Sequence, residues 1–265
     1  MTCPICAAAT GCFGTATVLQ AHLAEYRQCK SCGFLFVHEP AWLDQAYASA
    51  ITREDLGLVQ RNLWLSGAAS SVVSTWLDAG GRFLDYGGGT GLFTRLMRDA
   101  GFDWYWYDPF CHNLFAQGYA AEIRDGVSYE LLTAAEIFEH LVDPVAGVAG
   151  LTALSSNIIF TTQLLPDPPP PLDQWWYYGL EHGQHVSFYS RKSLKLLGER
   201  FGLELTSNGD NLHMFSKKAF SELLFKLVTT PLVSALVSRI ASRRSLLPAD
   251  FQRAREGQGR ADADR

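Results

Sequence analysis

The sequence predicts a mixed α/β fold built on a parallel sheet, and three features of the chain lead to that prediction. The first is a glycine-dense turn at residues 87–91, between a short apolar run and a segment with helical spacing. The second is a pair of later strand-like runs, 129–135 and 157–165, of which 157–165 is almost continuously apolar, as a buried parallel strand is. The third is two cysteine pairs near the N-terminus, which predict a small module ahead of the main domain.

The turn at 87–91 joins two predicted strands that each end in an acid. One strand ends at Asp85, and the other follows a predicted helix over 92–100 and ends at Asp108. Glycines let the backbone turn sharply and let a ligand lie against bare peptide, and the N-terminus of the following helix points its N–H groups at that ligand. Asp108 is then placed to accept hydrogen bonds from both hydroxyls of a ribose. A phosphate-binding loop would need Gly-Lys-Ser/Thr after the turn, and leucine follows here, which excludes that loop.

The segment Asp85-Tyr-Gly-Gly-Gly-Thr-Gly91 resembles the first motif, D/E-x-G-x-G-x-G, of class I S-adenosylmethionine-dependent methyltransferases, although that family often has Cys or Ser where this chain has Gly88. A dinucleotide-dependent oxidoreductase would instead show G-x-G-x-x-G. The resemblance implies a Rossmann-like seven-stranded sheet that binds S-adenosylmethionine, with Asp108 at the ribose and Asp85 and the turn at the amino-acid end. A glycine-rich turn without a ligand is the remaining alternative. The implied cofactor-binding residues are Asp85, Gly87, Gly88, Gly89, Gly91, Asp108, Pro109 and Glu136.

A second motif follows the predicted strand 129–135. Residues 136–144, EIFEHLVDP, resemble the E-V-L-E-H-x-x-D-P segment of many small-molecule methyltransferases, which implies that Glu136, Glu139 and His140 lie where cofactor and acceptor meet. His140 is a candidate general base, since the unperturbed pKa of histidine is near neutrality. In ubiquinone-pathway O-methyltransferases and a small-RNA 2′-O-methyltransferase, an E-x-x-E-H run binds a divalent cation, so the same three residues are a candidate magnesium site. A purely structural role in holding the loop is the third alternative.

A stiff proline-rich loop, 166–171, leaves the end of the predicted fifth strand and leads to a segment rich in aromatic residues and histidine. Residues 181–190, EHGQHVSFYS, resemble segments of polysaccharide and natural-product methyltransferases. They also resemble, in part, a segment of deoxysugar C-methyltransferases, which carry an N-terminal four-cysteine zinc module. Trp and Tyr faces suit stacking on sugar rings. Glu181, His182 and His185 are therefore candidate acceptor-binding or catalytic residues, with a structural bond that pins the loop as the alternative.

The cysteine pairs have the spacing Cys-x2-Cys, 22 residues, Cys-x2-Cys, which is typical of a four-thiolate structural zinc site. Four protein ligands leave no open position on the metal, so catalysis by this zinc is not expected. No signal peptide is visible and the predicted location is the cytoplasm, where disulfides would fit poorly. The predicted ligands are Cys3, Cys6, Cys29 and Cys32.

Composition and charge narrow the range of partners. Hydrophobic residues make up 48% and charged residues 18% of the 265 residues, as in an ordinary globular protein, and the net charge of −5 provides no general basic field for nucleic acid. We therefore expect a small-molecule acceptor rather than nucleic acid. Residues 219–244 form an amphipathic segment with basic flanks. This segment is predicted to pack on the domain or on a second copy in a homo-oligomer, with peripheral membrane contact as the alternative.

The expected function is methyl transfer from S-adenosylmethionine to a small molecule such as a sugar, a sugar-linked intermediate or a natural product, with O-, N- and C-methylation all left open. The alternatives are an RNA methyltransferase assisted by the zinc module and a non-catalytic S-adenosylmethionine-binding protein. The predicted segments are a zinc-binding module (1–38), a helical cap or linker (39–80), the cofactor-binding methyltransferase domain (81–218), an amphipathic helical region (219–250) and a disordered tail (251–265).

Overall fold

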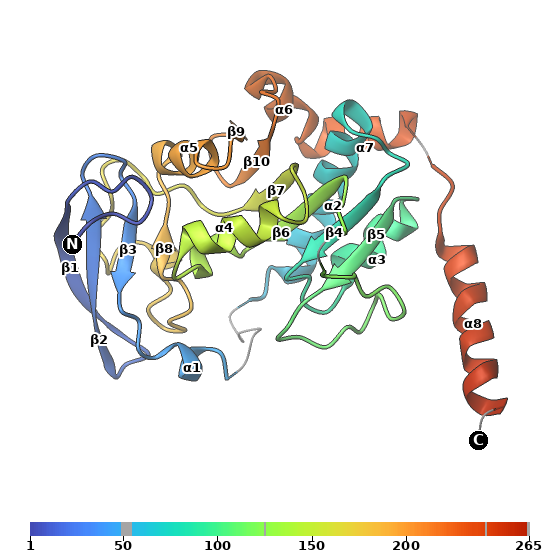
Figure 1. Cartoon of the computed structure of the whole chain (residues 1–265), viewed down its shortest axis with the longest axis horizontal. Coiled ribbons are helices and arrows are strands. Elements are labelled where there is room, and N and C mark those ends of the chain that lie inside the picture. The colour runs from blue at the N-terminus through green and yellow to red at the C-terminus, as the bar shows by residue number, and fades with distance from the viewer. Residues whose placement is uncertain (49–54, 125, 242, 264–265) are drawn as a thin grey trace. The chain divides into compact units, whose positions relative to one another are not determined.

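The computed structural model describes residues 1–48, 55–124, 126–241 and 243–263 (Figure 1). The chain divides into two compact units, each made of two separate stretches. The first unit is Met1–Asp55 with Thr133–Phe225, and the second is Leu56–Leu132 with Lys226–Arg265. Two elements cross from one unit to the other, namely β6 (Leu131–Ala135) and α6 (Glu222–Val228).

Over its described residues, the first unit contains two sheets and five short helices or helical turns besides the end of β6 and the start of α6. In chain order its elements are β1 (Thr10–Val18), β2 (His22–Cys29), β3 (Leu35–His38), α1 (Leu43–Ala46), η1 (Phe138–His140), α4 (Pro144–Thr152), β7 (Ile158–Thr161), η2 (Trp176–Tyr178), β8 (Ser187–Phe188), α5 (Arg191–Glu199), β9 (Glu204–Ser207) and β10 (Leu212–Ser216). A serine directly before a helical segment predicts an N-cap, and the structure confirms it at Ser190, whose side chain accepts a hydrogen bond from the Ser193 N–H at the start of α5.

The N-terminal sheet of this unit has the order β1-β2-β3-β8 and is antiparallel throughout. Its last strand comes from far along the chain, where Leu35 pairs with Phe188 and Phe36 with Ser187. Alternate residues of β2 and β3, among them Tyr26 and Leu35, are buried in one apolar core with Phe188. The cysteine module therefore shares its sheet and its core with residues that follow the predicted fifth strand.

The second sheet of the first unit has the order β6-β7-β10-β9. Strand β10 runs antiparallel to both β7 and β9, as the family resemblance implies for the last strand of the sheet. All four residues of β7 and all five of β10 are buried, which explains the near-continuous hydrophobicity of these segments.

The second unit contains the parallel strands β4 (Arg82–Tyr86) and β5 (Asp103–Tyr107), in the order β5-β4-β6, and the helices α2 (Leu58–Trp76), α3 (Leu92–Asp99), α7 (Pro231–Ile240) and α8 (Leu247–Ala263). The register pairs Asp85 with Trp106 and Tyr86 with Tyr107, so both strands end at the same edge. Strand, turn, helix and strand thus form the predicted βαβ unit, and the predicted mixed α/β, Rossmann-like architecture is confirmed.

The main difference from the predicted sheet is at residues 111–126, where the family resemblance implies a third strand. Between residues 111 and 126, leaving out residue 125, the structure has one isolated parallel bridge, Trp106 to Ala120, in place of a strand. The larger sheet therefore has six strands over the described residues, where seven were expected. Irregular backbone fits this stretch, since Gly118 and Gly126 both have positive φ angles of 84° and 81°. Asp125, which the family resemblance makes a candidate for an adenine contact, lies outside the described residues.

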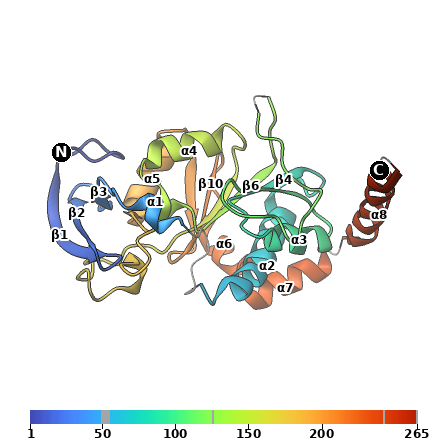
Figure 2. The ribbon, with the colours of Figure 1, turned by 90° about the horizontal axis from the view of Figure 1, so that it is seen from below.

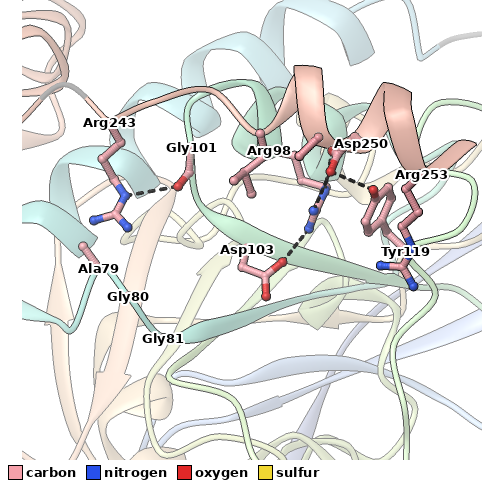
Figure 3. A pocket seen from close by; sticks show the side chains of 12 residues that line it. Ala79, Gly80, Gly81, Arg98, Gly101, Asp103, Tyr119, Arg243, Asp250 and Arg253 are labelled. Atoms are coloured by element: carbon pink, nitrogen blue, oxygen red, sulfur yellow. Dashed lines mark hydrogen bonds and ion pairs between the residues drawn. The ribbon is translucent and has the colours of Figure 1, made fainter.

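A buried ion pair holds the start of α8 in the second unit (Figure 3). Arg98, on α3, donates from Nε and Nη2 to the two carboxylate oxygens of Asp250 at 2.8 Å each, and the Tyr119 hydroxyl donates to Asp250 at 2.7 Å. A cavity of about 310 Å³ lies beside this pair. The structure thus has a helix over much of the segment that composition predicts to be disordered, and its first turn is fixed by charge and hydrogen bonds that sequence spacing does not reveal.

Candidate active site

The glycine turn of the second unit keeps its shape through hydrogen bonds to the neighbouring strand. The N–H groups of Gly87 and Gly88 donate to the Tyr107 carbonyl at 2.7 and 3.1 Å, and the Trp106 Nε1–H donates to the Gly89 carbonyl at 3.0 Å. Gly89 has a φ angle of 53°, and a Cβ added there would meet no atom within 4 Å. The turn therefore presents open backbone at Gly89, which is the cradle that the sequence motif predicts.

Gly88 is required for a different reason. A Cβ at this position would lie 2.5 Å from Asp85 Oδ2 and 2.7 Å from Trp106 Cδ1. Asp85 is buried, and its Oδ2 accepts a hydrogen bond from Thr94 Oγ1 at 3.1 Å. The departure from the family pattern at this position is explained by the side chains of Asp85 and Trp106, which occupy the space that Cys or Ser would need.

Replacement of Gly88 by alanine is expected to destabilise the protein by about 2 kcal/mol, because the added methyl group overlaps two packed side chains. Urea unfolding of the two proteins measures this difference. The matched control is Gly57→Ala in the same unit, where the nearest atom to an added Cβ is Arg61 Nη1 at 3.8 Å. If Gly88→Ala and Gly57→Ala lowered the free energy of unfolding equally, the turn would accommodate the added methyl group without extra strain, against this expectation.

Asp108 follows β5 directly and faces the turn. Its Oδ2 accepts a hydrogen bond from the Gly89 N–H at 2.8 Å, and its Oδ1 accepts from the N–H groups of Phe110 and Cys111 at 2.7 and 2.9 Å. Pro109 is exposed beside it. The carboxylate is thus fixed at the strand end by three backbone donors, next to the open peptide at Gly89.

Helix α3 begins immediately after the turn. Gly91 is its N-cap, with a φ angle of 81°, and no side chain caps the N–H groups of the first turn. A Cβ on Gly91 would lie 2.6 Å from Asn113 Oδ1, so the following loop packs closely here. The predicted residues 85, 87, 88, 89, 91, 108 and 109 therefore lie together in the second unit, whereas Glu136 belongs to the first.

The first unit contains a second group of predicted residues, which we call the histidine cluster: Glu139, His140 and His185. One ligand-type atom of each lies within 4.8 Å of the others, and the two imidazole centroids are 4.9 Å apart. The strand β6 and the turn η1 position Glu139 and His140, and the loop before β8 positions His185. The structure thus brings together residues that are 46 positions apart in sequence.

Backbone carbonyls determine the tautomers of both histidines. His185 Nδ1 lies 2.7 Å from the Tyr177 carbonyl, and His140 Nδ1 lies 3.1 Å from the Gln184 carbonyl. A carbonyl only accepts, so each Nδ1 carries the proton and each Nε2 keeps its lone pair. Both rings therefore present Nε2 as a base or as a ligand.

Burial controls the charges of the histidine cluster. It lowers the pKa of His140 to about 4 and the pKa of His185 well below the ordinary value, so both rings are neutral near pH 7. Burial, and then the Glu136 charge, raise the pKa of Glu139 to about 8. Neither Glu139 oxygen has a hydrogen bond of regular geometry within the described part of the chain, although the Tyr177 and Thr162 hydroxyls act to lower its pKa. The cluster is thus a buried carboxyl group beside two neutral imidazoles that are partly exposed.

The other predicted residues of the first unit lie around this cluster. Glu136 is held apart from it, since its backbone N–H donates to Thr161 Oγ1 and the Thr161 hydroxyl donates to its carboxylate. The His182 ring packs against the His185 ring at a centroid distance of 4.7 Å, and Glu181 is exposed. The predicted cation set of Glu136, Glu139 and His140 is therefore not the set that converges, because Glu139 and His140 converge with His185 instead.

Residues that position the site were harder to find by sequence reasoning. Tyr47 brings its hydroxyl to 2.9 Å from His140 Nδ1. Gln184 and Tyr177 act through backbone carbonyls, which any residue type could supply, so their identities gave no signal. Trp106 lies within an apolar strand and reads as a core residue, although its indole N–H fixes the Gly89 carbonyl.

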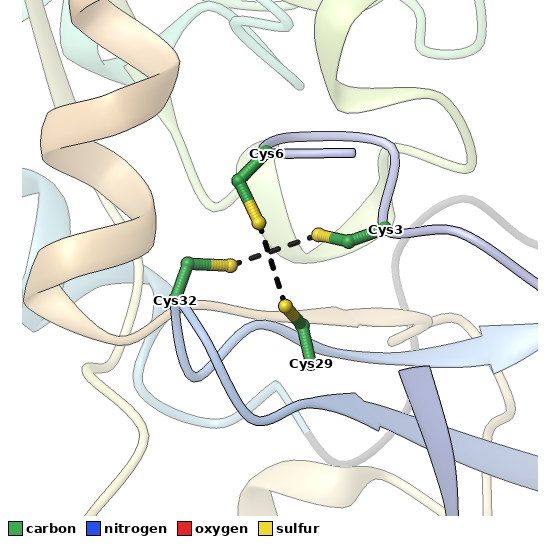
Figure 4. Close-up of side chains that lie close together, drawn as sticks. All are labelled: Cys3, Cys6, Cys29 and Cys32. Carbon is green, nitrogen blue, oxygen red and sulfur yellow. Dashed lines mark hydrogen bonds between the residues drawn. The ribbon is translucent and has the colours of Figure 1, made fainter. Parts of the chain in front are cut away.

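The four predicted zinc ligands converge in the first unit (Figure 4). The Sγ atoms of Cys3 and Cys32 are 3.6 Å apart, those of Cys6 and Cys29 are 3.4 Å apart, and all four lie within 4.8 Å of one another. Side chains at the two caps of α5 hold the two knuckles in place: Ser190 donates to the Cys32 carbonyl and Arg200 to the Ile5 carbonyl. Cys12 is exposed and lies outside this group.

Comparison with known protein families gives one family match, which covers the middle of the chain. The family model "Methyltransferase domain" matches residues 64–208, which is more than half of the chain. A comparison with curated protein sequences finds no match. The matched range includes the glycine turn, Asp108 and the whole histidine cluster.

Several solved structures are similar to this chain, at low identity. CalO1, a methyltransferase of calicheamicin biosynthesis in its SAH-bound form, shares 14% identity at a TM-score of 0.41 over 58% of this chain and 54% of its own. TnmH shares 16% identity at a TM-score of 0.44 over 68% of this chain and 62% of its own. Magnesium protoporphyrin IX methyltransferase from Synechocystis PCC 6803, with bound SAH, shares 14% at 0.41 over 66% of this chain and 91% of its own.

These structural likenesses are too weak to bear on function, and the chain spans only 54–66% of the length of the first solved structures that it matches. The family match depends on the sequence of residues 64–208, and the βαβ unit, the open turn and Asp108 lie within that range. The chain therefore belongs to the family of methyltransferase domains.

Proposed function

We propose that this protein transfers a methyl group from S-adenosylmethionine to a small molecule, with a sugar, a sugar-linked intermediate or a natural product as the preferred acceptor class. The observation that carries the proposal is the open peptide at Gly89 beside the fixed carboxylate of Asp108, within a chain that belongs to the methyltransferase domain family. In the aromatic segment 175–178, Tyr177 and Tyr178 are buried in the core and Trp175 packs against it, whereas the exposed Trp176 has a face that suits stacking on a ring-shaped acceptor.

Residues of the glycine turn would hold the methyl donor. Asp108 would accept hydrogen bonds from the ribose hydroxyls, and the N–H groups at the start of α3 would face the amino-acid end. Bound S-adenosylmethionine supplies an electrophilic methyl group on a sulfonium. The protein's own contribution is alignment of the acceptor and exclusion of water, which together reduce the entropic barrier to transfer.

The histidine cluster would take the proton that the acceptor loses. His185 is the better candidate base, because its Nδ1–H is donated to the Tyr177 carbonyl at 2.7 Å and its Nε2 lone pair stays free at neutral pH. The carboxyl group of Glu139 lies within 4.8 Å; its raised pKa of about 8 leaves it mostly neutral near pH 7, so only its ionised form would stabilise the imidazolium that results. His140, fixed in the same tautomer, would orient the acceptor, and His182 would support the His185 ring.

The donor set of the histidine cluster favours this role over magnesium binding. Magnesium prefers an octahedron of oxygen ligands, whereas the cluster offers two imidazoles and one carboxyl group whose pKa is raised to about 8. Glu136, the second carboxylate of the expected magnesium set, is engaged with Thr161. The residues present therefore fit magnesium poorly.

Zinc fits the four-cysteine group. In a tetrahedron with zinc–sulfur bonds of about 2.3 Å, sulfur atoms lie roughly 3.8 Å apart, and the pairs here lie 3.4 and 3.6 Å apart. The neighbouring Cys32 thiol lowers the pKa of Cys3, which favours the thiolate form that zinc binds. Cys3, Cys6, Cys29 and Cys32 would hold a structural zinc ion, which would link the N-terminal strands to the rest of the first unit.

The charges near the cysteine module favour a small-molecule acceptor over RNA. An RNA-binding module would need a basic face around Arg27 and Lys30, but Arg27 pairs with Glu25 and also donates to Thr10. The net charge of the whole chain is −5, which is also unfavourable for binding RNA. RNA binding that weakens steeply with salt would reverse this preference.

Transfer of labelled methyl groups tests the proposal directly. The protein is incubated with S-adenosylmethionine labelled on the methyl group and with separate pools of sugars, nucleotide sugars, phenolic compounds and RNA. We expect label in a small-molecule pool, and we expect His185→Ala to reduce transfer at least about 100-fold while S-adenosylhomocysteine affinity is retained. Binding of S-adenosylhomocysteine without transfer to any pool would favour the non-catalytic alternative, and transfer to RNA alone would contradict the acceptor class.

A further inference from the structure

The end of α6 and the whole of α7 expose a stripe of large apolar side chains in the second unit. Leu232, Leu236 and Ile240 recur every fourth residue of α7 and are 87%, 56% and 78% exposed, and Leu227 at the end of α6 is 52% exposed. The opposite side of α7 is used for packing: Ser234 is 4% exposed and lies against Gly67 of α2. One side of the helix is therefore part of the fold, while the apolar stripe is covered by none of the described residues.

Helix α2 adds to the exposed apolar area of this unit. Figures 1 and 2 show α2 and α7 side by side. On the N-terminal half of α2, Val59 and Leu63 are one helical turn apart and are 57% and 55% exposed. Both helices thus expose aliphatic side chains although they pack against each other, which is unusual for helices of a fully covered domain.

The charges on this segment are all of one sign. Residues 223–249 contain no Asp or Glu, and their four charged residues are Lys226, Arg239, Arg243 and Arg244. Within the described residues, Lys226, Arg239 and Arg244 are exposed and form no ion pair, and Arg243 donates only to the Gly101 carbonyl. This local charge of +4 contrasts with the −5 of the whole chain.

The lengths of these helices exclude a spanning role for either one. Helix α7 has 10 residues, about 15 Å at 1.5 Å per residue, against roughly 30 Å for the hydrocarbon core of a bilayer. No single helix in the described chain is long and apolar enough to cross a membrane, and α6 and α7 meet such a test only as a pair bent by 80°. Short, bent, amphipathic helices with basic flanks have the pattern of segments that lie in a membrane interface.

We propose that the α7 stripe, with Leu227 and the four basic residues, docks this protein on the surface of a bilayer that contains anionic lipids. A second copy of the chain is a poorer occupant, because a two-fold interface would place each basic segment against its own equivalent and bring like charges together. Anionic headgroups complement those charges, and the Leu and Ile side chains enter the acyl boundary. This inference does not depend on the proposed methyl transfer.

Sedimentation of the full chain with lipid vesicles tests the proposal. We expect the protein to sediment with vesicles of phosphatidylcholine and phosphatidylglycerol (3:1) and to stay in solution with phosphatidylcholine alone. Replacement of Leu232, Leu236 and Ile240 by serine should weaken vesicle binding at least tenfold. Replacement of Lys226, Arg239 and Arg244 by glutamine should weaken it by about fivefold per charge, with a matching loss of salt dependence.

The matched control is Leu23→Ser, which removes a leucine that is 77% exposed on β2 of the other unit and should leave vesicle binding unchanged. Unchanged S-adenosylhomocysteine affinity and unfolding midpoint show that the triple variants are folded. No binding to anionic vesicles, or equal binding to neutral ones, overturns the proposal. It is also overturned if the wild-type protein ignores vesicles but dimerises in sedimentation equilibrium, and if the serine variant abolishes that dimer.

Discussion

Cys29→Ala is expected to abolish stoichiometric zinc binding and to destabilise the N-terminal part of the first unit by more than about 4 kcal/mol. Structural zinc in small modules contributes roughly 10–16 kcal/mol, and a three-thiolate site keeps only part of it. Cys29 is the last residue of β2, so its loss also removes the tie between that strand and the Cys3 knuckle. Mass spectrometry of the metal content and amide exchange over residues 1–38 measure the two effects.

Cys12→Ala is the matched control, since Cys12 is an exposed cysteine outside the four-sulfur group, and it should retain one zinc ion per chain. The glycine turn and Asp108 belong to the other unit, so Cys29→Ala should leave affinity for S-adenosylhomocysteine within about threefold of the wild type. Equal zinc content in wild type and Cys29→Ala would contradict the assignment of the four cysteines as the zinc ligands. Loss of both zinc and cofactor affinity would show that the two units depend on each other.

Asp108→Ala should weaken binding of S-adenosylhomocysteine about 100-fold. Two hydrogen bonds from ribose hydroxyls to a carboxylate are worth about 3 kcal/mol together, and the open peptide at Gly89 loses the acceptor that orients its N–H. Isothermal titration calorimetry measures the change. The effect should be on enthalpy as well as affinity, because the lost contacts are charge-assisted hydrogen bonds.

Asp99→Ala provides the control for Asp108→Ala. Asp99 is a partly exposed carboxylate of the same unit that pairs with Arg95 one helical turn away, and its removal should leave the affinity unchanged. An Asp108→Ala protein that is folded and binds S-adenosylhomocysteine as tightly as the wild type would refute the ribose assignment. Tight binding of a nicotinamide dinucleotide would instead support the oxidoreductase alternative.

Sequence patterns predicted the fold well wherever the residues that determine an element lie close together in the chain. The glycine turn, the acids at the ends of β4 and β5, and the Ser190 cap are each specified by residues within a few positions of one another. The prediction of a third strand, which came from the family pattern, was wrong: the backbone is irregular there, with positive φ angles at Gly118 and Gly126. The helix after Leu247 was missed because its anchor, Arg98, is 152 positions away from Asp250.

The candidate site was predicted in parts rather than as an arrangement. Residue types identified Glu139, His140 and His185 separately, but only the folded chain shows that they converge and that Glu136 does not. The tautomers depend on the carbonyls of Tyr177 and Gln184, and a carbonyl leaves no trace in the identity of its residue. Burial, which determines the charges of the cluster, is likewise a property of the tertiary structure.

The pairing of β3 with β8 has a consequence for how the protein is made. Residues 35–36 leave the ribosome about 150 positions before their partners at 187–188, so the N-terminal sheet has an open edge during most of translation. A bound metal ion at the cysteines would keep β1 and β2 together during that interval. Ribosome-stalled chains that end before residue 187 should therefore be more sensitive to protease at β3 than chains that end beyond α5.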